Sequence, residues 1–278
     1  MTSSERLIRL RALPAHLALA LAGALTLAPL VWMLGISLTT PRDIGGAALR
    51  PVPSHPTLEN YRTALADSDI PLHLGNSVVF AGGVTLGLLC VSIPAAYALS
   101  RWRFRGQGAF VAAMLIGMSV PFVVTYIPNF LLLSRLHLLN TYPGLIVPHM
   151  ANAFGVLLLM QHFRAFPTSV IEAAHLDGAG SWTTLTKIVL PAVKAPILAI
   201  SLSVFISTWN ELVWPQLVAN KPGSQVLAAG LAQFASLEGG VSYGPLMASA
   251  TMTALPTILL FLIFRRRLLA VTLEGAIR

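Results

Sequence analysis

Six apolar segments, separated by shorter polar stretches, dominate the pattern of hydrophobic and polar positions along the chain. A helix that crosses a bilayer needs about 20 predominantly apolar residues, and each of the six segments reaches that length. The pattern therefore predicts an all-α, polytopic membrane protein with six transmembrane helices. They are expected at residues 13–38, 74–99, 109–133, 142–163, 192–219 and 245–264.

The first apolar segment has a second interpretation, because a basic start followed by an Ala-rich tract is also typical of a cleaved signal peptide. The apolar core of such a peptide is about 7–15 residues long, and residues 13–38 exceed that length. We therefore expect a retained helix. The polar, Pro-rich stretch that follows, residues 39–73, predicts an extramembrane loop with a short helix near residues 58–67.

Prolines within the expected spans predict breaks or bends, because proline has no N–H to donate and its ring crowds the preceding turn. They are Pro94, Pro121, Pro128, Pro148 and Pro256. Near the end of the chain, residues 220–244 predict an extramembrane loop rich in Gly, Ser and Gln. Residues 268–278 predict a short tail.

Residues 166–191 form the longest run in the second half of the chain that is too polar for lipid. Thr168 or Ser169 is expected to cap a first short helix, and Ser181 a second one that runs up to the next span. Between them Gly178 is the expected left-handed stop, since glycine reaches that conformation without a Cβ clash. A partner-docking element and an ordinary solvated loop both fit this pattern.

The composition supports a bilayer location, with 55% of residues hydrophobic and 10% charged, against about 25% charged in soluble domains. The net charge of +8 does not indicate nucleic-acid binding, because the basic residues flank apolar segments and form no single patch. Six spans put both termini on one side, together with 13 of the 18 Lys and Arg residues. Since positive loops stay cytoplasmic, we expect both termini and residues 166–191 to face the cytoplasm.

We expect one integral membrane domain built from two parts. Residues 1–73 supply a transmembrane helix and an extracytoplasmic loop, and residues 74–278 supply a five-helix core that carries residues 166–191. The single cysteine, Cys90, excludes a disulfide within the chain and is expected to act as a small packing residue.

Sequence motifs for catalysis and for metal binding are missing. There is no GxxxxGK[ST] run to hold a nucleotide and no GxSxG elbow to present a nucleophile. The seven histidines include no pair at metal-ligand spacing on one helix face, and only one cysteine could join them. We therefore expect neither a catalytic residue nor a metal site in this chain.

Glu211 is the one acidic residue that the pattern places inside a span. At about 1.5 Å per residue it lies roughly 25 Å beyond Lys194, near the outer surface, and Trp209 and Trp214 flank it as in an interfacial belt. Two roles stay open. In the first, Asn210 and Glu211 line the outer mouth of a transport pathway. In the second, Glu211 only reaches the water between lipid headgroups or holds the end of a helix in place.

Three amides in the other spans also have two interpretations. Amide groups suit the hydroxyls of a sugar, but in membranes they more often join helices, each contributing about 0.6 kcal/mol. These residues are Asn76, Asn129 and Asn152.

The segment 166–191 contains every residue of a long gapped pattern, at its full spacing: Glu172, Ala173, Ala174, Gly178, Ile188, Leu190 and Pro191. This pattern resembles the EAA loop of ABC-importer permeases. The runs Asp177-Gly178-Ala179 and Trp209-Asn210-Glu211 are similar to its carbohydrate branch, the MalG/UgpE-like inner membrane components of binding-protein-dependent transport. The resemblance covers residues 58–278.

The resemblance implies a MetI-like permease fold in a bacterial inner membrane, and a subunit of an ATP-driven importer of a sugar or oligosaccharide. Residues 170–177 would be a coupling helix that contacts a separate ATPase through Glu172 and exits sharply at Gly178. The coupling site implied by the motif comprises Glu172, Ala173, Ala174, Asp177, Gly178, Ile188, Leu190 and Pro191.

The implied partners are a second homologous permease, two ATP-binding subunits that hold ATP and Mg²⁺, an extracytoplasmic solute-binding protein and membrane lipid. This chain itself would bind no cofactor. The loop at 220–244 is the expected contact for the binding protein. The ending Glu274-Gly275-Ala276 weakly resembles a tail that reaches the ATPases.

Other functions remain open at this stage. One is an importer of glycerol 3-phosphate or a glycerophosphodiester, within the same family. Another is an ion-coupled secondary transporter, which would need ionisable residues near mid-membrane that the sequence does not place there. A scaffold without transport activity would not need a Gly-centred docking element.

Overall fold

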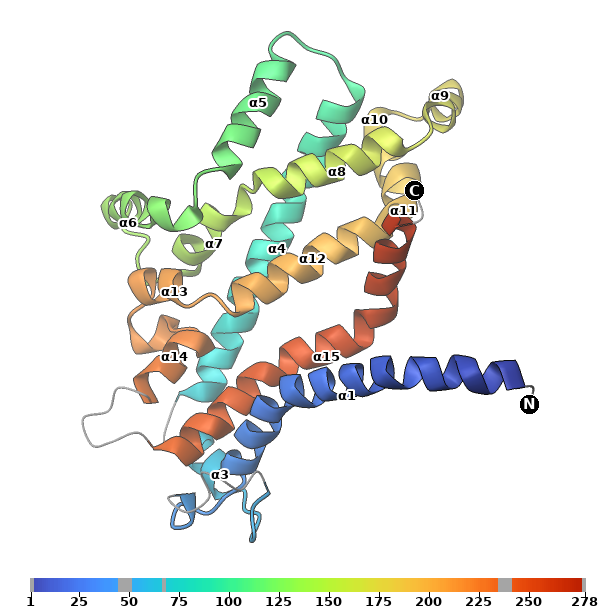
Figure 1. Cartoon of the computed structure of the whole chain (residues 1–278). Coiled ribbons are helices and arrows are strands. Elements are labelled where there is room, and N and C mark those ends of the chain that lie inside the picture. The colour runs from blue at the N-terminus through green and yellow to red at the C-terminus, as the bar shows by residue number, and fades with distance from the viewer. Residues whose placement is uncertain (1–2, 45–51, 67–68, 235–241, 277–278) are drawn as a thin grey trace. The chain divides into compact units, whose positions relative to one another are not determined.

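The computed structural model describes residues 3–44, 52–66, 69–234 and 242–276, with side chains for residues 14–44, 52–66, 69–231 and 242–265. Every regular element within those ranges is a helix (Figure 1). The all-α class expected from the sequence is therefore confirmed.

Three helices of the described chain are long and apolar enough to cross a membrane. They are α1 (Ser3–Ser37), α4 (Ile70–Arg101) and α15 (Tyr243–Ala276), with apolar parts at Pro14–Ser37, Ile70–Arg101 and Tyr243–Arg265. They match the first, second and sixth expected spans.

Three bent pairs of helices pass the same test of length and composition when the two members of each pair are taken together. The first joins α5 (Gln107–Met118) to η1 (Phe122–Thr125) and α6 (Tyr126–Arg135) at 93°. The second joins α7 (Tyr142–Met150) to α8 (Ala153–Ala165) at 48°. The third joins the run Ser181–Ala192 to α12 (Lys194–Trp209) at 80°.

The fifth expected span, residues 192–219, is wrong as a single helix. The helix α12 ends at Trp209, and a separate helix, α13 (Val213–Val218), follows a break. The expected loop at 220–244 contains η3 (Pro222–Ser224) and α14 (Leu227–Phe234), while its residues 235–241 lie outside the described residues. The expected tail at 268–278 instead continues α15 as far as Ala276.

Proline alone does not mark where these helices break. Pro121 lies at the break between α5 and η1, as expected. Pro94 and Pro256 lie inside the uninterrupted helices α4 and α15. Pro148 lies inside α7, and the chain changes direction only after Met150, where Asn152 begins a new helix.

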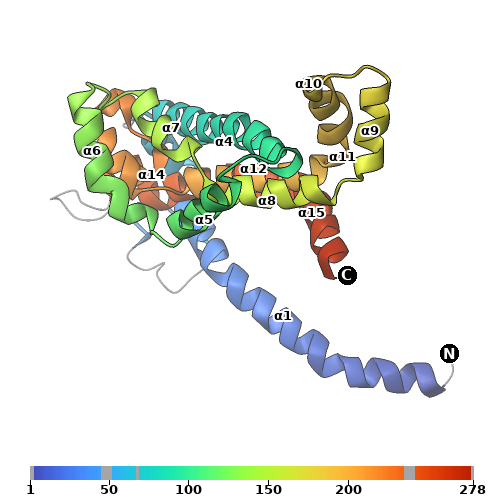
Figure 2. The ribbon, with the colours of Figure 1, turned by 90° about the horizontal axis from the view of Figure 1, so that it is seen from above.

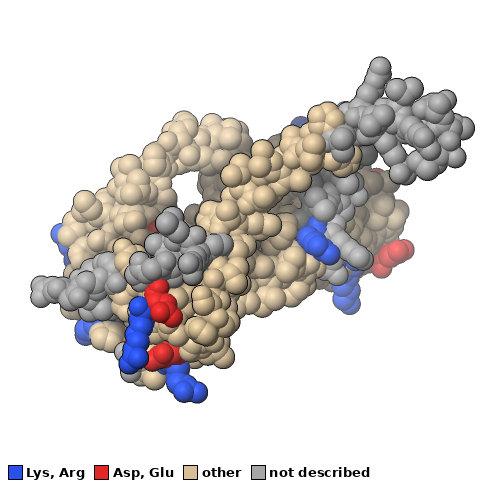
Figure 3. All heavy atoms as spheres, turned by 60° about the horizontal axis from the view of Figure 1, so that its bottom comes forward, with Lys and Arg blue, Asp and Glu red and all other residues tan. Residues whose placement is uncertain are grey.

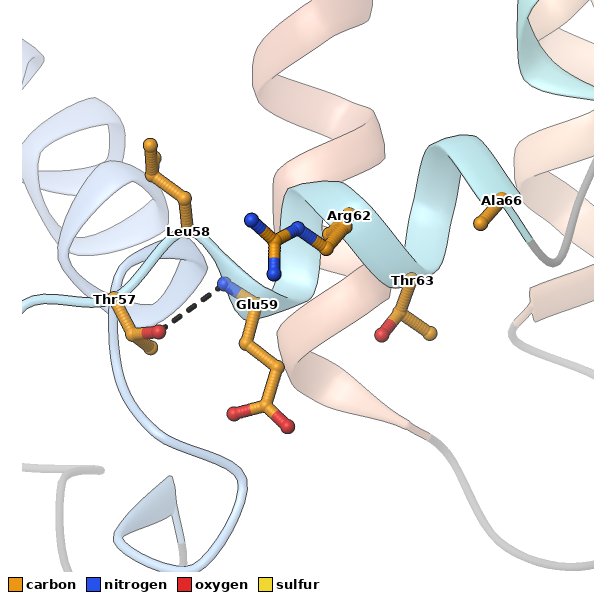
Figure 4. A pocket seen from close by; sticks show the side chains of 6 residues that line it. All are labelled: Thr57, Leu58, Glu59, Arg62, Thr63 and Ala66. Atoms are coloured by element: carbon orange, nitrogen blue, oxygen red, sulfur yellow. Dashed lines mark hydrogen bonds between the residues drawn. The ribbon is translucent and has the colours of Figure 1, made fainter.

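The chain divides into two compact units, residues 1–70 with 231–255 and residues 71–230 with 256–278. In the first unit, α3 (Glu59–Ala66) confirms the short helix expected near 58–67. Its buried Asn60 donates from Nδ2 to the carbonyls of Ser37 (3.0 Å) and Thr39 (2.7 Å), which ties α3 to the end of α1. An open pocket of about 550 Å³ lies over α3, where Thr57 Oγ1 accepts from the backbone N–H of Glu59 at 3.2 Å (Figure 4).

The second unit has two apolar clusters, each formed by several helices. The first, called here the coupling-side cluster, joins α4, α8, α9 (Thr168–Leu176), η2 (Leu185–Val189) and α12. The second surrounds Phe80 and Trp214 and joins α4, α6, α7 and α13. The two clusters pack the first and second halves of α4 against different sets of helices.

Many large apolar side chains face outward, as in a protein whose solvent is lipid. Leu19 is 72% exposed, and Ile116 and Ile127 are each 70% exposed. Figure 3 shows one face on which charged side chains form only small groups, and most of the described surface is uncharged. An aqueous protein rarely exposes so much contiguous apolar surface.

Candidate functional site

The helix α9 is a short element between α8 and the run Ser181–Ala192. In two perpendicular views it lies beyond the C-terminal end of α8 (Figures 1 and 2). It begins at Thr168, with Pro167 in the capping position, so the expected side-chain cap from Thr168 or Ser169 is wrong. The expected cap from Ser181 is also wrong, because Gly180 occupies that position and Ser181 is the first residue of α10 (Ser181–Thr184).

The end of α9 has the conformation that the sequence predicts for Gly178. Its φ angle is +82°, in the left-handed region. The backbone N–H of Gly178 donates to His175 O at 3.0 Å, and that of Ala179 donates to Ala174 O at 2.9 Å. This pair of bonds is the Schellman motif, which satisfies carbonyls left free at a helix end. The chain thus leaves α9 by a sharp, fully hydrogen-bonded turn.

One face of α9 is buried and the other is open. Ile171 and Ala174, one turn apart, are 7% and 6% exposed, and Ile171 packs into the coupling-side cluster. Glu172, Ala173 and Asp177 are exposed on the remaining surface.

The exposed side of this element also carries large apolar side chains. Leu176 is 90% exposed and Trp182 is 69% exposed. Since the element is too polar to enter lipid, its outward apolar groups indicate a surface for a protein partner or for the bilayer interface.

The second half of the motif lies in an irregular helix. Residues Leu185–Val189 form a π-helical turn, and α11 (Leu190–Ala192) follows it. The widened turn directly precedes Pro191, which lacks an N–H and whose ring would crowd the carbonyl four residues back in a regular helix. Ile188 and Leu190 are half-buried, and Pro191 is exposed. The chain then turns by 80° into α12.

Arg101 also contributes to this site, although the sequence indicated it only as one of the basic residues that set the membrane topology. It ends α4, and its Nη2 donates to the carbonyls of Phe163 and Phe166, the latter at 3.1 Å. These carbonyls lie at the C-terminal end of α8, where cations satisfy free acceptors and the helix dipole. An arginine at the end of an apolar span is the only signal that could have indicated this contact.

The five candidate pathway residues each make contacts of their own. No hydrogen bond recorded between described residues links any two of them. Asn76 is 1% exposed, and its Nδ2 donates to Gly223 O (3.1 Å) and Gln225 O (2.8 Å) while its Oδ1 accepts from the Tyr142 hydroxyl (2.7 Å). Its polar groups are used internally, which favours the helix-joining role for Asn76.

The other two span amides are engaged locally. Asn152 caps α8 by accepting from the backbone N–H of Gly155 at 3.0 Å. Asn129 donates to Thr125 Oγ1 at 3.3 Å, one turn earlier in the chain. Both are half-buried, so part of each side chain stays accessible.

Glu211 lies in the break between α12 and α13, just beyond the end of the helix. Its Oε1 accepts from the Tyr126 hydroxyl at 3.0 Å and from the backbone N–H of Trp214 at 3.3 Å. It therefore connects the break to α6 and to the first turn of α13. Asn210 is exposed and donates to Ile206 O at 2.8 Å. Of the two roles left open for Glu211, the structure documents the pinning of a helix end.

Comparisons with known proteins agree with this arrangement. A family described as "Binding-protein-dependent transport system inner membrane component" matches residues 83–269. The chain is 30% identical over 266 residues to the diacetylchitobiose uptake system permease protein NgcG of Streptomyces coelicolor, covering 95% of this chain and 88% of that protein. It is 33% identical over 196 residues to the sn-glycerol-3-phosphate transport system permease protein UgpE of Yersinia pestis, covering 70% of each.

A solved structure shares the fold. A chain of a bacterial ABC transporter involved in the import of the acidic polysaccharide alginate superposes with a TM-score of 0.84 at 22% identity, covering 96% of this chain and 98% of that one. The MetI-like permease architecture expected from the sequence is thereby confirmed. The ion-coupled alternative gains no support from any of these matches.

Proposed function

This chain belongs to the family of binding-protein-dependent transport system inner membrane components, and from that premise we propose how it works. It is the membrane-spanning subunit of an ATP-driven importer and is driven by a separate ATPase through α9. The observation that carries this proposal is the two-sided character of α9. Its inner face is packed into the coupling-side cluster, and its outer face exposes Glu172, Ala173, Leu176 and Asp177.

The packing suggests how a push on α9 reaches the bilayer. Ile171 shares the coupling-side cluster with Phe163 of α8, Leu185 of η2 and Ile200 of α12. Interiors packed at crystal-like density transmit displacement instead of absorbing it. A rigid-body movement of α9 would therefore carry the inner ends of α8 and α12 with it.

The partners follow from the family and from what this chain lacks. Its sequence has no phosphate-binding loop, so ATP and Mg²⁺ are assigned to two ATP-binding subunits. A second homologous permease would complete the pathway, and an extracytoplasmic binding protein would deliver the solute near residues 220–234. The excess of basic residues on the terminal side supports placing both termini and α9 in the cytoplasm.

The proposed solute is a sugar or oligosaccharide. The relative named for diacetylchitobiose uptake supports this class. The match to a glycerol-3-phosphate permease supports a second candidate, a glycerol phosphate or its diester. Measuring which of these solutes the cognate binding protein binds would decide between the two candidates, because an anion and a neutral sugar need different side chains in the binding site.

Within this importer, Glu211 and Asn210 remain the candidates for the outer mouth of the pathway. Both lie at the interruption between α12 and α13, where irregular backbone is tolerated in a membrane protein if it lines water or protein. Asn129 and Asn152 are secondary candidates. Asn76 is proposed instead as a brace for the segment 223–225.

Photo-crosslinking tests the coupling proposal directly. A photoreactive residue in place of Leu176 should capture the ATPase in the assembled transporter. The matched control places the same photoreactive residue at Ile127, which should not capture the ATPase. Ile127 is 70% exposed and belongs to α6, at the other end of the second unit (Figure 1). Capture from Ile127 alone, or from neither position, would contradict the assignment.

A further inference from the structure

A groove beside the coupling element is not used by the function proposed above. It has a volume of about 400 Å³ and separates the end of α4 from the start of α10. Its lining includes Tyr97, Ala98 and Trp102 on one wall and Ser181, Trp182 and Leu185 on the other. The volume is in the range of about 300–1,000 Å³ found for sites that bind small ligands.

The two tryptophans place this groove at the level of lipid headgroups. Trp102 directly follows the last residue of the α4 span and is 56% exposed, and Trp182 is 69% exposed. Exposed tryptophan is characteristic of the membrane–water interface, where its ring meets hydrocarbon and its N–H meets water. An acyl chain would find an apolar slot between the two rings.

The chain segments that supply the two walls carry charges of one sign. Arg103 and Arg105 follow Trp102 in the chain, Lys187 follows Leu185 by two residues, and all three are exposed. Residues 97–107 and 179–190, which supply the two walls, contain no Asp or Glu. Arg101 is already engaged with the carbonyls of α8. The exposed arginines that follow Trp102 in the chain suit a phosphate, which arginine binds through parallel N–H donors.

We propose that this groove binds one anionic phospholipid, with an acyl chain between Trp102 and Trp182 and the phosphate on Arg103 and Arg105. A zwitterionic lipid would leave the net positive charge of the rim uncompensated. An apolar side chain from a neighbouring subunit would fill the slot but leave the arginines without an anion. Charge complementarity therefore selects the acidic lipid.

The bound lipid would act as a brace between the two walls of the groove. The α4 wall is tied to α8 through Arg101, and the α10 wall continues from α9 through Gly178 and Gly180. A lipid held by both walls would limit how far α9 can swing relative to α4. This regulatory consequence rests on the function proposed above, whereas the binding of the lipid does not.

Fluorescence quenching measures the binding itself. The intact transporter is purified with its accompanying subunits and reconstituted in vesicles containing brominated phosphatidylglycerol or, at the same fraction, brominated phosphatidylcholine. Tryptophan emission should be quenched more strongly by the acidic lipid. The double variant Arg103→Gln, Arg105→Gln should lower the relative affinity for phosphatidylglycerol by about 30-fold.

Two further variants separate the groove from the general lipid annulus. Arg265→Gln removes an exposed basic residue of α15 that does not line the groove, and it should keep the excess quenching. Trp182→Phe removes a reporter within the groove and should reduce that excess. Equal quenching by the two lipids, or an excess that survives the double arginine variant, overturns the proposal. If transport does not depend on the ATPase but phosphatidylglycerol still quenches more strongly than phosphatidylcholine, the lipid site is supported and the proposed function is wrong.

Discussion

Gly178 ends α9 with a backbone conformation that other residues adopt only under strain. A Cβ at this position would meet no atom within 4 Å, so the cost of a substitution comes from its φ of +82° alone. That cost is about 1–2 kcal/mol for an L-residue, and it is higher for a β-branched one. Gly178→Val should therefore lower the population with a docking-competent turn roughly 5- to 30-fold. Uptake by the reconstituted transporter should fall accordingly.

The neighbouring Gly180 supplies a matched control for that experiment. It is equally open, but its φ of −70° and ψ of 162° are extended backbone that valine favours. Gly180→Val should retain uptake, and Gly178→Asn should be milder than Gly178→Val because Asn tolerates the left-handed region. Membrane levels of all three variants should match the native chain. Equal loss in the Gly178→Val and Gly180→Val variants would refute the conformational explanation.

Two substitutions of Glu211 distinguish the effect of its charge from the effect of its hydrogen bonds. Gln at this position keeps an oxygen that can accept from Tyr126 and Trp214, whereas Ala removes both bonds, each contributing about 0.6 kcal/mol in a membrane protein. If the carboxylate lines the pathway, Glu211→Gln should reduce uptake while the melting temperature stays unchanged. Glu211→Ala should lower both. Native uptake in Glu211→Gln would leave only the bracing role.

At the scale of elements, Arg101 is the contact that holds α8 in register with α4 immediately before the coupling helix. Arg101→Gln removes the charged donor to Phe163 and Phe166, and a hydrogen bond to a charged group contributes about 1.5–3 kcal/mol. Backbone amides in Ile171–Leu176 should then exchange faster with solvent, as hydrogen–deuterium exchange would measure. Arg164→Gln, an exposed residue of α8 with the same charge, should leave exchange unchanged.

The sequence predicts that these helices exist better than it predicts where the chain bends between them. Apolar length alone located the continuous helices α1, α4 and α15, and the gapped motif located α9 and its glycine turn. Pro121 correctly marked one break, but proline did not predict the others, because Pro94 lies within continuous α4 while the turn of 48° falls at Asn152, after Pro148. Which of these residues ends a helix depends on packing against neighbouring helices, and that information is not local to the sequence.

In the candidate site too, some features were predictable from the sequence and others were not. The exposed Glu172 and the positive φ of Gly178 follow from local chemistry, and both were predictable from the motif. The commitment of Asn76 to residues about 150 positions further along the chain was not predictable. Neither was the contact of Arg101 with α8, because both depend on helices that meet only in the folded protein.

At the scale of the whole molecule, the proposed mechanism depends on which side of the membrane α9 faces. Within the second unit, α9 and α13 lie at opposite ends (Figure 1). Of the 18 basic residues, 13 lie on the side assigned to the termini and α9. Positive loops remain cytoplasmic, so residues near α9 should be reachable only from inside, and those after α13 only from outside.

Cysteine labelling tests this orientation. Cys90 is exposed and is first replaced by Ser. In that background, Arg164→Cys, just before α9, should react with a membrane-impermeant maleimide only in inside-out vesicles. Lys221→Cys, after α13, should react only in intact, right-side-out membranes; both positions are exposed. The reverse result would place α9 away from ATP, and an ATPase could then not drive this chain through that helix.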